Sequence, residues 1–532
     1  MKMLRDWECE NELLFPGVLC HNVGWFSAQD VRANAEQMTI SIYIVCGILG
    51  FLVAWGFIPL ILEFSRRMAR LQRDKCFHHG NAAPISRLGG VAIAAAFVVC
   101  VFSAARASGE SIPLGTMNVL LGSLAMFALG LLDDLNPIGA RLKLVGQILI
   151  SGFVAWGGST LECMTNPLSG TSVEVNFFAG WAVSVLWLVA LTNLINIIDG
   201  IDGLAGGISL MLMVLLAFST AGGSEFLVML TLGMIGALVG FLYFNFPPAR
   251  IYMGDGGAYF LGFLIGGLTL VTSQKGTVAA ALVAPVFALA LPIIDVALAI
   301  VRRALKGLPV FRADRRHIHH RLVESGFSHR RTLLTLYVVS LLFLLMAFGV
   351  FWSQGRLVPL FLGLSFLVVI YIVHSFGLVS SKYSLQSFWR ELHSMRRESR
   401  YTMLLAQWLE LEAERCQTPE ELWENFVFIA AKLDLAEVKL HMRDGMLAWR
   451  DPRLSDAVEL VGKRHDFHGS TILGLEMYAQ PNKDLPKVFE MKCELAAEAW
   501  FKAASRWRTA HNAEFHLSPN GNRLVAVRPA LL

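Results

Sequence analysis

The chain has 532 residues, of which 55% are hydrophobic and only 16% are charged, and its mean hydropathy is +0.54. Soluble domains usually carry about 25% charged residues, so this composition excludes one large soluble enzyme as well as a fibrous or largely disordered protein. The formal net charge of +4 is small for this length and gives no reason to expect a nucleic-acid partner. The composition therefore predicts a membrane-embedded protein.

Eleven nearly uncharged stretches are long enough to cross a bilayer, which takes about 20 apolar residues. Only Glu225 separates the sixth stretch from the seventh, so residues 203–249 allow more than one division. We predict an all-α polytopic membrane domain of about eleven transmembrane helices over residues 39–381. In chain order the predicted spans are 39–62, 88–105, 115–132, 144–161, 175–198, 203–224, 226–249, 256–274, 276–294 (running on to Val301), 332–352 and 357–381.

The Lys and Arg residues of the short loops indicate the orientation, because such residues gather on the cytoplasmic side. With the N-terminus outside, the inner loops hold eighteen of them and the outer side holds six. Residues 1–38 then form a polar extracytoplasmic segment, and the chain after the last span lies in the cytoplasm.

The composition changes after Ser381, and residues 382–532 are rich in charge. This stretch has the length of one soluble domain. It opens with a basic amphipathic helix of the kind that lies along an anionic leaflet. Thr418, Pro419 and Glu421 then mark the start of a second helix.

Beyond that helix the tail alternates between strand and helix patterns. Val438, Leu440 and Met442 alternate with polar residues, which predicts a half-buried strand. A strand near 469–478, a helix near 484–508 and a short terminal strand complete an α+β module. The module is similar to a small GAF-type sensor domain and carries no catalytic motif, so we expect it to regulate the protein or to dock a regulator.

Charged residues are costly inside a membrane, so those that persist near the spans are candidates for function. The first cluster is Asp133 and Asp134 at the inner end of a span, with Lys143 following in the next loop. Adjacent carboxylates repel unless a cation or a proton relieves them, so one could steer a metal or a polar substrate while the other takes a proton. Taken alone, the pair is more typical of the start of a solvated loop.

The second cluster is a polar stripe in the segment NLINIIDGIDGLAGG. Its members recur every third residue and share one face of a helix, and they are Asn193, Asn196, Asp199 and Asp202. Oxygen ligands of this kind suit Mg²⁺ or Mn²⁺ rather than zinc. Polar residues that join helices would explain one of these side chains but not four.

Two more clusters lie further along the chain. Asp255 stands between Gly254 and Gly256 at a helix start, where backbone N–H groups can meet phosphate and the carboxylate can hold a metal; alone, it is typical of a turn and an N-cap.

The last cluster is a basic loop whose arginines could bind phosphate and whose histidines could donate a proton to it. An anionic lipid surface would explain its arginines better than its histidines. The loop contains Arg302, Arg303, Arg312, Arg315, Arg316, His317, His319 and His320.

All four clusters fall on the predicted inner side of the membrane. Together they offer carboxylates, amides, glycines, Lys, Arg and His on one face. Phosphoryl transfer from a doubly phosphorylated donor needs this inventory: groups that hold a metal, cations for the developing charge, and a base.

At these positions the sequence resembles the polyprenyl-phosphate N-acetylhexosamine-1-phosphate transferase superfamily, glycosyltransferase family 4. The matching motifs are the DD at 133–134 with Lys143, the NxxNxxDGxDGLA run at 193–205, the MGD at 253–255, the HIHH at 317–320 and the PISRLGG at 84–90. The resemblance covers about residues 40–380. It implies an all-helical enzyme of the bacterial cytoplasmic membrane that moves a sugar-1-phosphate from a UDP-sugar to a polyprenyl phosphate and releases UMP.

The resemblance also implies roles for individual residues. Asn196 and Asp255 would be ligands of Mg²⁺, or of Mn²⁺ in its place. The catalytic residues would be Asp133 or Asp134 for the lipid phosphate, Lys143 for the pyrophosphate, and Asp199 and Asp202 for the metal or uridine side. The substrates would also be met by Asn193, Arg302, Arg303, Arg316, His317, His319 and His320.

Several alternatives stay open at this stage. The ADRRHIHHRL loop is similar to the branch that uses UDP-N-acetylglucosamine for cell-envelope glycans such as lipopolysaccharide, whereas the branch that uses UDP-MurNAc-pentapeptide for peptidoglycan tends towards PIHHH. The reaction could be a direct attack by the lipid phosphate or pass through a covalent aspartyl-phosphate. A rival of another class is a transporter or membrane sensor, although the halves share no motif. The expected partners are the UDP-sugar and the polyprenyl phosphate, with a homodimer left open.

Overall fold

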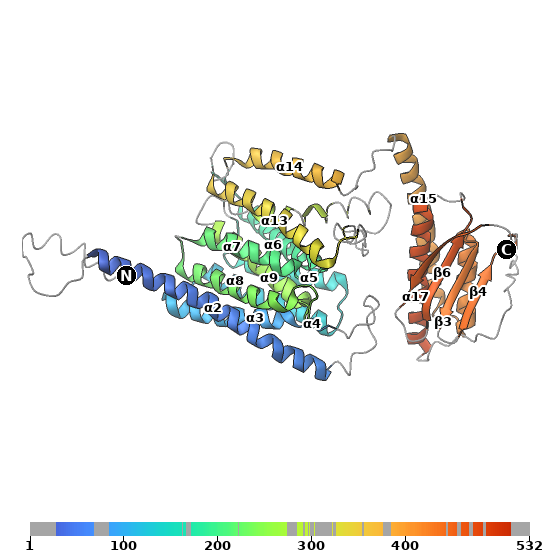
Figure 1. The fold of residues 1–532 in the computed structure, drawn as a ribbon, viewed down its shortest axis with the longest axis horizontal. Coiled ribbons are helices and arrows are strands. Elements are labelled where there is room, and N and C mark those ends of the chain that lie inside the picture. The colour runs from blue at the N-terminus through green and yellow to red at the C-terminus, as the bar shows by residue number, and fades with distance from the viewer. Residues whose placement is uncertain are drawn as a thin grey trace, which may run out of the picture.

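The computed structural model shows a helical body followed by a smaller domain with a β-sheet (Figure 1). The body is made of helices that lie side by side, as its apolar sequence predicts. The residues that the structure describes are 28–68, 85–161, 163–165, 172–221, 223–273, 285–290, 293–295, 297, 300, 303, 322, 326–353, 356–375, 385–442, 445–454, 459–467, 472–481 and 486–511.

Ten long helices form the described part of the body. Seven of them, α2, α3, α4, α6, α8, α9 and α13, are long and apolar enough to cross a membrane. Two further apolar helices, α7 and α14, are shorter, and α5 has 17 residues. The bounds are α2 Ala28–Met68, α3 Gly89–Ser108, α4 Leu114–Leu135, α5 Ala140–Trp156, α6 Phe177–Ile198, α7 Leu204–Thr220, α8 Glu225–Asn245, α9 Gly254–Ser273, α13 His329–Trp352 and α14 Val358–Ser375.

The number of predicted spans agrees only in part with the structure: eleven spans are predicted, and seven of the described helices are long and apolar enough to cross a membrane. The division of residues 203–249 is confirmed, since α7 ends at Thr220 and α8 begins at Glu225. The ninth predicted span, 276–301, lies largely outside the described residues. The first helix begins at Ala28 rather than at 39, because residues 28–38 contain no helix breaker and continue the helix into the polar segment. Between α5 and α6, Cys163–Thr165 (β1) pairs antiparallel with Ser172–Glu174 (β2), a hairpin that the hydropathy pattern did not predict.

Helix α9 lies at the centre of the body. Of its apolar segment 94% is buried inside the protein, against 28% for α2, and it packs on α3, α4, α6 and α7. Its glycines allow this crowding, because a Cβ at Gly262 would lie 2.6 Å from the Thr192 Cα of α6. The peripheral helices turn apolar side chains outward instead, such as Phe153 on α5 and Leu186 on α6, as expected for surfaces that face lipid.

The helices α2 and α8 cross in direct backbone contact. A Cβ at Gly236 of α8 would lie 1.8 Å from the Gly47 carbonyl oxygen of α2, and a Cβ at Gly50 would lie 1.9 Å from the Gly233 carbonyl oxygen. Small residues at such crossings let membrane helices approach closely and gain van der Waals contact. The crossing therefore holds the long first helix onto the body.

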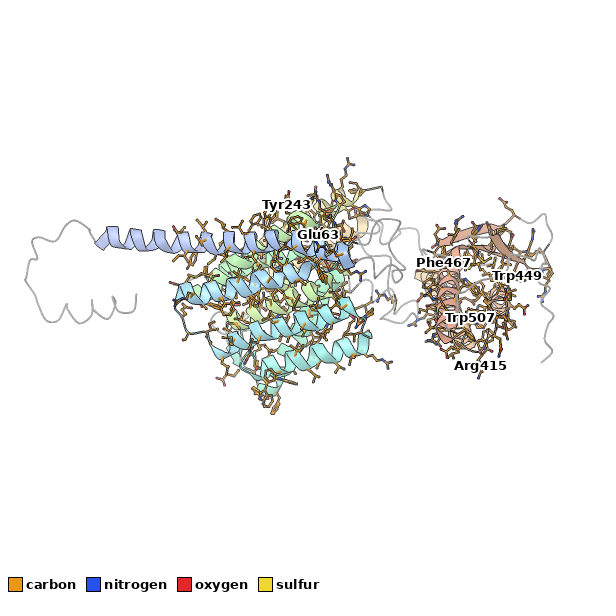
Figure 2. The ribbon with its side chains drawn as sticks, turned by 90° about the horizontal axis from the view of Figure 1, so that it is seen from below. Glu63, Tyr243, Arg415, Trp449, Phe467 and Trp507 are labelled. Carbon is orange, nitrogen blue, oxygen red and sulfur yellow. The ribbon has the colours of Figure 1, made fainter. Side chains whose placement is uncertain are left out.

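The tail forms a separate domain with its own core. Its four-stranded antiparallel sheet has the order β4-β3-β6-β5, and Trp449, Phe467 and Trp507 lie within the domain (Figure 2). The alternation predicted for Val438, Leu440 and Met442 is confirmed, since all three are buried on β3. The bounds are α15 Leu385–Glu412, α16 Pro419–Lys432, β3 Glu437–Met442, β4 Gly445–Arg450, β5 Val461–Asp466, β6 Ile472–Ala479 and α17 Pro486–His511.

The predicted start of α16 is also confirmed, because the Thr418 side chain accepts from the Glu421 N–H. The first helix of the tail packs in part on the last one, since Met395 of α15 lies against Val488 and Met491 of α17. Other apolar side chains of α15, such as Leu404 and Leu411, are exposed, so the contact of this helix with a leaflet stays a prediction. The predicted terminal strand lies outside the described residues.

We predict that Gly236→Ala lowers the stability of the protein in detergent, because the new methyl group would force α2 and α8 apart. Overpacking of this kind costs about 1–3 kcal/mol. The measurement is the midpoint of thermal unfolding followed by tryptophan fluorescence. Gly56→Ala on α2 is the matched control, since a Cβ there would meet nothing within 4 Å. Equal midpoints for the two variants would contradict the contact.

Candidate active site

Polar residues from four helices meet at one end of the body, here called the site end. They come from the last turn of α4, the first turn of α5, the last turn of α6 and the first turn of α9. In sequence these positions are spread over more than a hundred residues, and the packing of α9 on α4 and α6 brings them together.

The carboxylate of Asp255 is the centre of this arrangement. Its Oδ1 accepts a hydrogen bond from the Asn196 side-chain N–H at 2.9 Å. Its Oδ2 lies 3.2 Å from the Lys143 ammonium, which also forms an ion pair with Asp133. The Tyr259 hydroxyl lies 3.5 Å from the same Oδ2. Thus one cation stands between two carboxylates, with an amide on the other side.

Asp134 binds the backbone of α9 rather than a side chain. Its Oδ1 accepts from the Asp255 N–H at 3.0 Å and its Oδ2 from the Gly256 N–H at 2.9 Å. These are among the N–H groups that a helix leaves unpaired at its N-terminus, and a carboxylate there also meets the positive end of the helix dipole. Asp134 therefore caps α9 from α4 and fixes where Asp255 lies.

Gly254 is required at this junction. Its φ is +77°, a conformation that favours glycine. A Cβ on Gly254 would also lie 2.1 Å from the Arg87 carbonyl oxygen and 2.6 Å from the Asp134 Oδ2. The MGD motif thus contains its glycine because α9 begins in close contact with two other segments.

The segment before α3 is one of these two. Its backbone pairs with the MGD loop: the Tyr252 N–H donates to the Ser86 carbonyl at 2.8 Å, and the N–H groups of Gly89 and Gly90 donate to the Tyr252 and Met253 carbonyls at 2.9 and 2.8 Å. This pairing brings Arg87 to the site end, a residue that our sequence analysis did not select. Its place in the PISRLGG motif was the signal that could have identified it.

Asp199 lies just beyond the end of α6 and next to the same carboxylates. Its burial and the nearby charges of Asp255 and Asp134 raise the pKa of Asp199 well above its usual range, while the positive charge of Arg87 opposes the shift. A Gly254 N–H also donates to it. The crowding of carboxylates at the site end therefore favours the protonated form of Asp199.

Asp202 joins two loops of the site end. Its Oδ2 accepts from the Ala249 N–H at 2.9 Å. Beside it, Asn245 accepts from the Gly203 N–H at 2.9 Å, and the Tyr337 hydroxyl of α13 donates to the Gly203 carbonyl at 2.5 Å. The described contact of Asp202 is thus with a backbone N–H, and Asn245 and Tyr337 bind the backbone of the neighbouring Gly203.

Asn193 makes contacts within the helical bundle. Its side-chain N–H groups donate to the Gln147 side-chain oxygen at 2.6 Å and to the Val189 carbonyl at 2.8 Å. Of the predicted basic loop, only Arg303 belongs to the described residues, where it is half-buried. The others, Arg302, Arg316, His317, His319 and His320, lie outside them, as do Arg312 and Arg315.

The side chains that meet at the site end fit a hard divalent cation. Four carboxylates gather here, Asp133, Asp134, Asp199 and Asp255, close to the cations Lys143 and Arg87. Within the described part of the chain, no group of three or more His, Cys, Asp or Glu residues is arranged so that it could hold a metal ion by itself. Mg²⁺ does not need one, because it is usually bound by one or two carboxylates together with substrate phosphates. The ligands that this arrangement offers are the carboxylate of Asp255 and the side-chain carbonyl oxygen of Asn196.

Comparisons with known proteins agree with this architecture. Residues 116–273, which run from α4 through α9, match the family described as glycosyl transferase family 4. This range contains Asp133, Lys143, Asn196 and Asp255, that is, the centre of the site.

Three relatives show how far the similarity extends. The chain is 33% identical over 301 residues to the probable undecaprenyl-phosphate N-acetylglucosaminyl 1-phosphate transferase of Bacillus subtilis, which covers 56% of this chain and 82% of the relative. It is 30% identical over 288 residues to the decaprenyl-phosphate N-acetylglucosaminephosphotransferase of Mycobacterium tuberculosis, covering 48% of this chain and 70% of the relative. It is 29% identical over 324 residues to the phospho-N-acetylmuramoyl-pentapeptide-transferase of Shouchella clausii, covering 56% of this chain and 94% of the relative.

The similarity to the Bacillus relative extends over most of that protein at 33% identity, and the family match spans the helices that carry the site. The expectation drawn from the motifs is therefore confirmed, and the chain belongs to glycosyl transferase family 4.

Proposed function

We propose that this protein transfers N-acetylglucosamine-1-phosphate from UDP-N-acetylglucosamine to undecaprenyl phosphate, which releases UMP and begins a lipid-linked glycan of the cell envelope. The observation that carries the proposal is the position of Lys143 between Asp133 and Asp255, with Asn196 on the far side of Asp255. The activities for which the Bacillus and Mycobacterium relatives are named support the substrate class.

In the proposed reaction an oxygen of the lipid phosphate attacks the β-phosphorus of the UDP-sugar. The bond from that phosphorus to the bridging oxygen breaks, UMP leaves with the bonding electrons, and a new diphosphate joins lipid and sugar. Lys143 would move from carboxylate to phosphate contact and balance the charge that develops on the leaving oxygen. A bound Mg²⁺ would supply further positive charge for the phosphate oxygens.

The contacts of the two adjacent aspartates support different roles for them. Both oxygens of Asp134 accept backbone N–H groups of α9, so we assign it to holding α9 in place. Asp133 accepts from the Ile138 N–H at 2.7 Å and pairs with Lys143; we assign it to steering the lipid phosphate towards the donor.

Two other candidate functions receive less support. A phospho-N-acetylmuramoyl-pentapeptide transferase shares the chemistry, but the HIHH sequence of the basic loop departs from the pattern of that branch. A transporter would place polar groups along a path through the bundle, whereas the described carboxylates and Lys143 meet at one end. We further propose that the site end faces the cytoplasm of a bacterial cell, where a UDP-sugar is available.

We predict that the purified protein releases UMP from UDP-N-acetylglucosamine only when Mg²⁺ and undecaprenyl phosphate are present. A panel should include UDP-N-acetylgalactosamine, UDP-glucose and UDP-MurNAc-pentapeptide, with UMP measured by chromatography. UMP release from the pentapeptide donor alone would move the protein to the peptidoglycan branch. If no UDP-sugar gives UMP, the proposed function is wrong.

We predict that Asp255→Asn and Asn196→Ala each lower kcat by about 100-fold or more, a loss typical of removing one electrostatic contact from a transition state. Both variants should remain folded, and chelation with EDTA should abolish the activity of the unaltered protein until Mg²⁺ is restored. Glu110→Gln is the matched control, since Glu110 accepts from Ser224 and the Glu225 N–H at the start of α8. Metal-dependent turnover at the normal rate in Asp255→Asn would contradict the metal assignment.

We predict that truncation after Ser381 leaves basal activity in place, because the tail domain has a hydrophobic core separate from that of the membrane body. The measurement is UMP release by the truncated and full chains at equal amounts of folded protein. Complete loss of activity in a truncated protein that keeps its melting temperature would show that the tail completes the site. We propose that the tail instead regulates the enzyme or docks a regulator.

A further inference from the structure

We propose that Gln147 is a positioning residue, which holds the beginning of α5, and with it Lys143, against Asp255 through its bond to Asn193. The inference rests on the proposed function, because Lys143 is there assigned to the phosphates. It also explains why one of the four members of the polar stripe lies within the bundle rather than among the carboxylates.

Helix α5 buries few side chains in its first half. Its buried side chains are Gln147, Ser151, Val154 and Ala155, so Gln147 is the only one among residues 140–150. Its neighbours Leu142 and Leu149 are 65% and 67% exposed and face outward. Fully buried apolar side chains therefore secure only the far half of α5, whereas the half that carries Lys143 has Gly146 beside Leu129 of α4 as an apolar contact.

The bond between Gln147 and Asn193 lies in apolar surroundings. Gln147 is 1% exposed, and its side-chain oxygen accepts from Asn193 at 2.6 Å. Asn193 in turn donates to the Val189 carbonyl of its own helix at 2.8 Å, which fixes the direction of its amide. A polar group inside a membrane protein is costly unless it has a partner, so each of the two amides stabilises the other.

This bond lies one helical turn from the centre of the site on both helices. Lys143 precedes Gln147 by four residues on α5, and Asn196 follows Asn193 by three on α6, so each pair shares a helix face. Lys143 and Asn196 contact the two oxygens of Asp255 at 3.2 and 2.9 Å. The helices α5 and α6 are thus joined at two places, directly by the bond between Gln147 and Asn193 and, about 5 Å further along, through Asp255.

A diphosphate that binds Lys143 would separate it from its carboxylates and break the link between α5 and α6 through Asp255. The bond between Gln147 and Asn193 would then keep the first half of α5 in its position against α6. Without it, the ammonium would no longer be held at the place where charge develops. Displacement of a catalytic group by about 1 Å can cost about 100-fold in rate. The loss should fall on kcat rather than on the KM for the donor, since Gln147 itself touches no substrate.

The test uses the full chain with Gln147→Leu, which keeps the size of the side chain but removes the acceptor. We expect kcat for UMP release to fall by about 100-fold, with the donor KM little changed. Labelling of Lys143 by an amine reagent, followed by mass spectrometry, should become faster, because the residue is now held only by its ion pairs. Unchanged kcat, or unchanged labelling of Lys143, would overturn the proposal.

Trp181→Phe is the matched control. Trp181 of α6 donates to the Gly152 carbonyl of α5 at 3.0 Å, so it joins the same two helices by the same kind of bond at the opposite half. Its loss should leave kcat and Lys143 labelling unchanged. An equal effect of both variants would mean that any loosening of α5 matters and that Gln147 has no special role.

A reciprocal exchange keeps the proposal testable if Gln147→Leu does not fold. Asn193→Gln alone should slow turnover, and Gln147→Asn with Asn193→Gln should restore it, because the total reach of the two amides is conserved. No recovery in the double variant would contradict the proposal. If the unaltered protein acts on no UDP-sugar, the proposed function fails, whereas the labelling of Lys143 still tests whether Gln147 holds it.

Discussion

The carboxylate of Asp134 fixes the start of α9, and the rest of the site depends on this contact. Its two oxygens accept the first N–H groups of α9 at 3.0 and 2.9 Å, where the helix dipole favours a negative charge. Since α9 is the most buried helix of the body, this contact sets α4 and α9 in register. Asp255 then has one position, facing Asn196 of α6 and Lys143 of α5.

The scarcity of charge makes such contacts specific. A polar group in an apolar bundle must find a partner, and each amide or carboxylate of the site end has few to choose from. Gln147 meets Asn193, Asp202 meets the backbone of Ala249, and Lys143 meets Asp133 and Asp255. Among the described residues of the site end, carboxylates outnumber the cations, which suits the binding of a divalent cation that a diphosphate substrate would share.

The tail forms a domain with a core of its own, enclosed by its sheet and helices and apart from the helices that carry the candidate active site. Part of the apolar surface of α15 packs on α17, where Lys492, only 3% exposed, pairs with Glu398 of α15 at 3.2 Å. A buried lysine of this kind is destabilising unless its partner stays in place. The first helix of the tail is therefore part of the domain.

The sequence by itself determined the family, the membrane class, the break between α7 and α8, and the residue types of the site, because hydropathy and motif spacing are local properties of the chain. Only the tertiary structure decided what each polar residue contacts. It brought Arg87 to the site end, made Asp134 a cap of α9, and paired Asn193 with Gln147, whereas the spacing of the stripe treated Asn193 and Asn196 alike. It also packed Met395 of α15 against α17. These contacts depend on how helices that are distant in sequence pack together. The local sequence of an apolar face or of an amide does not specify the partner that it contacts.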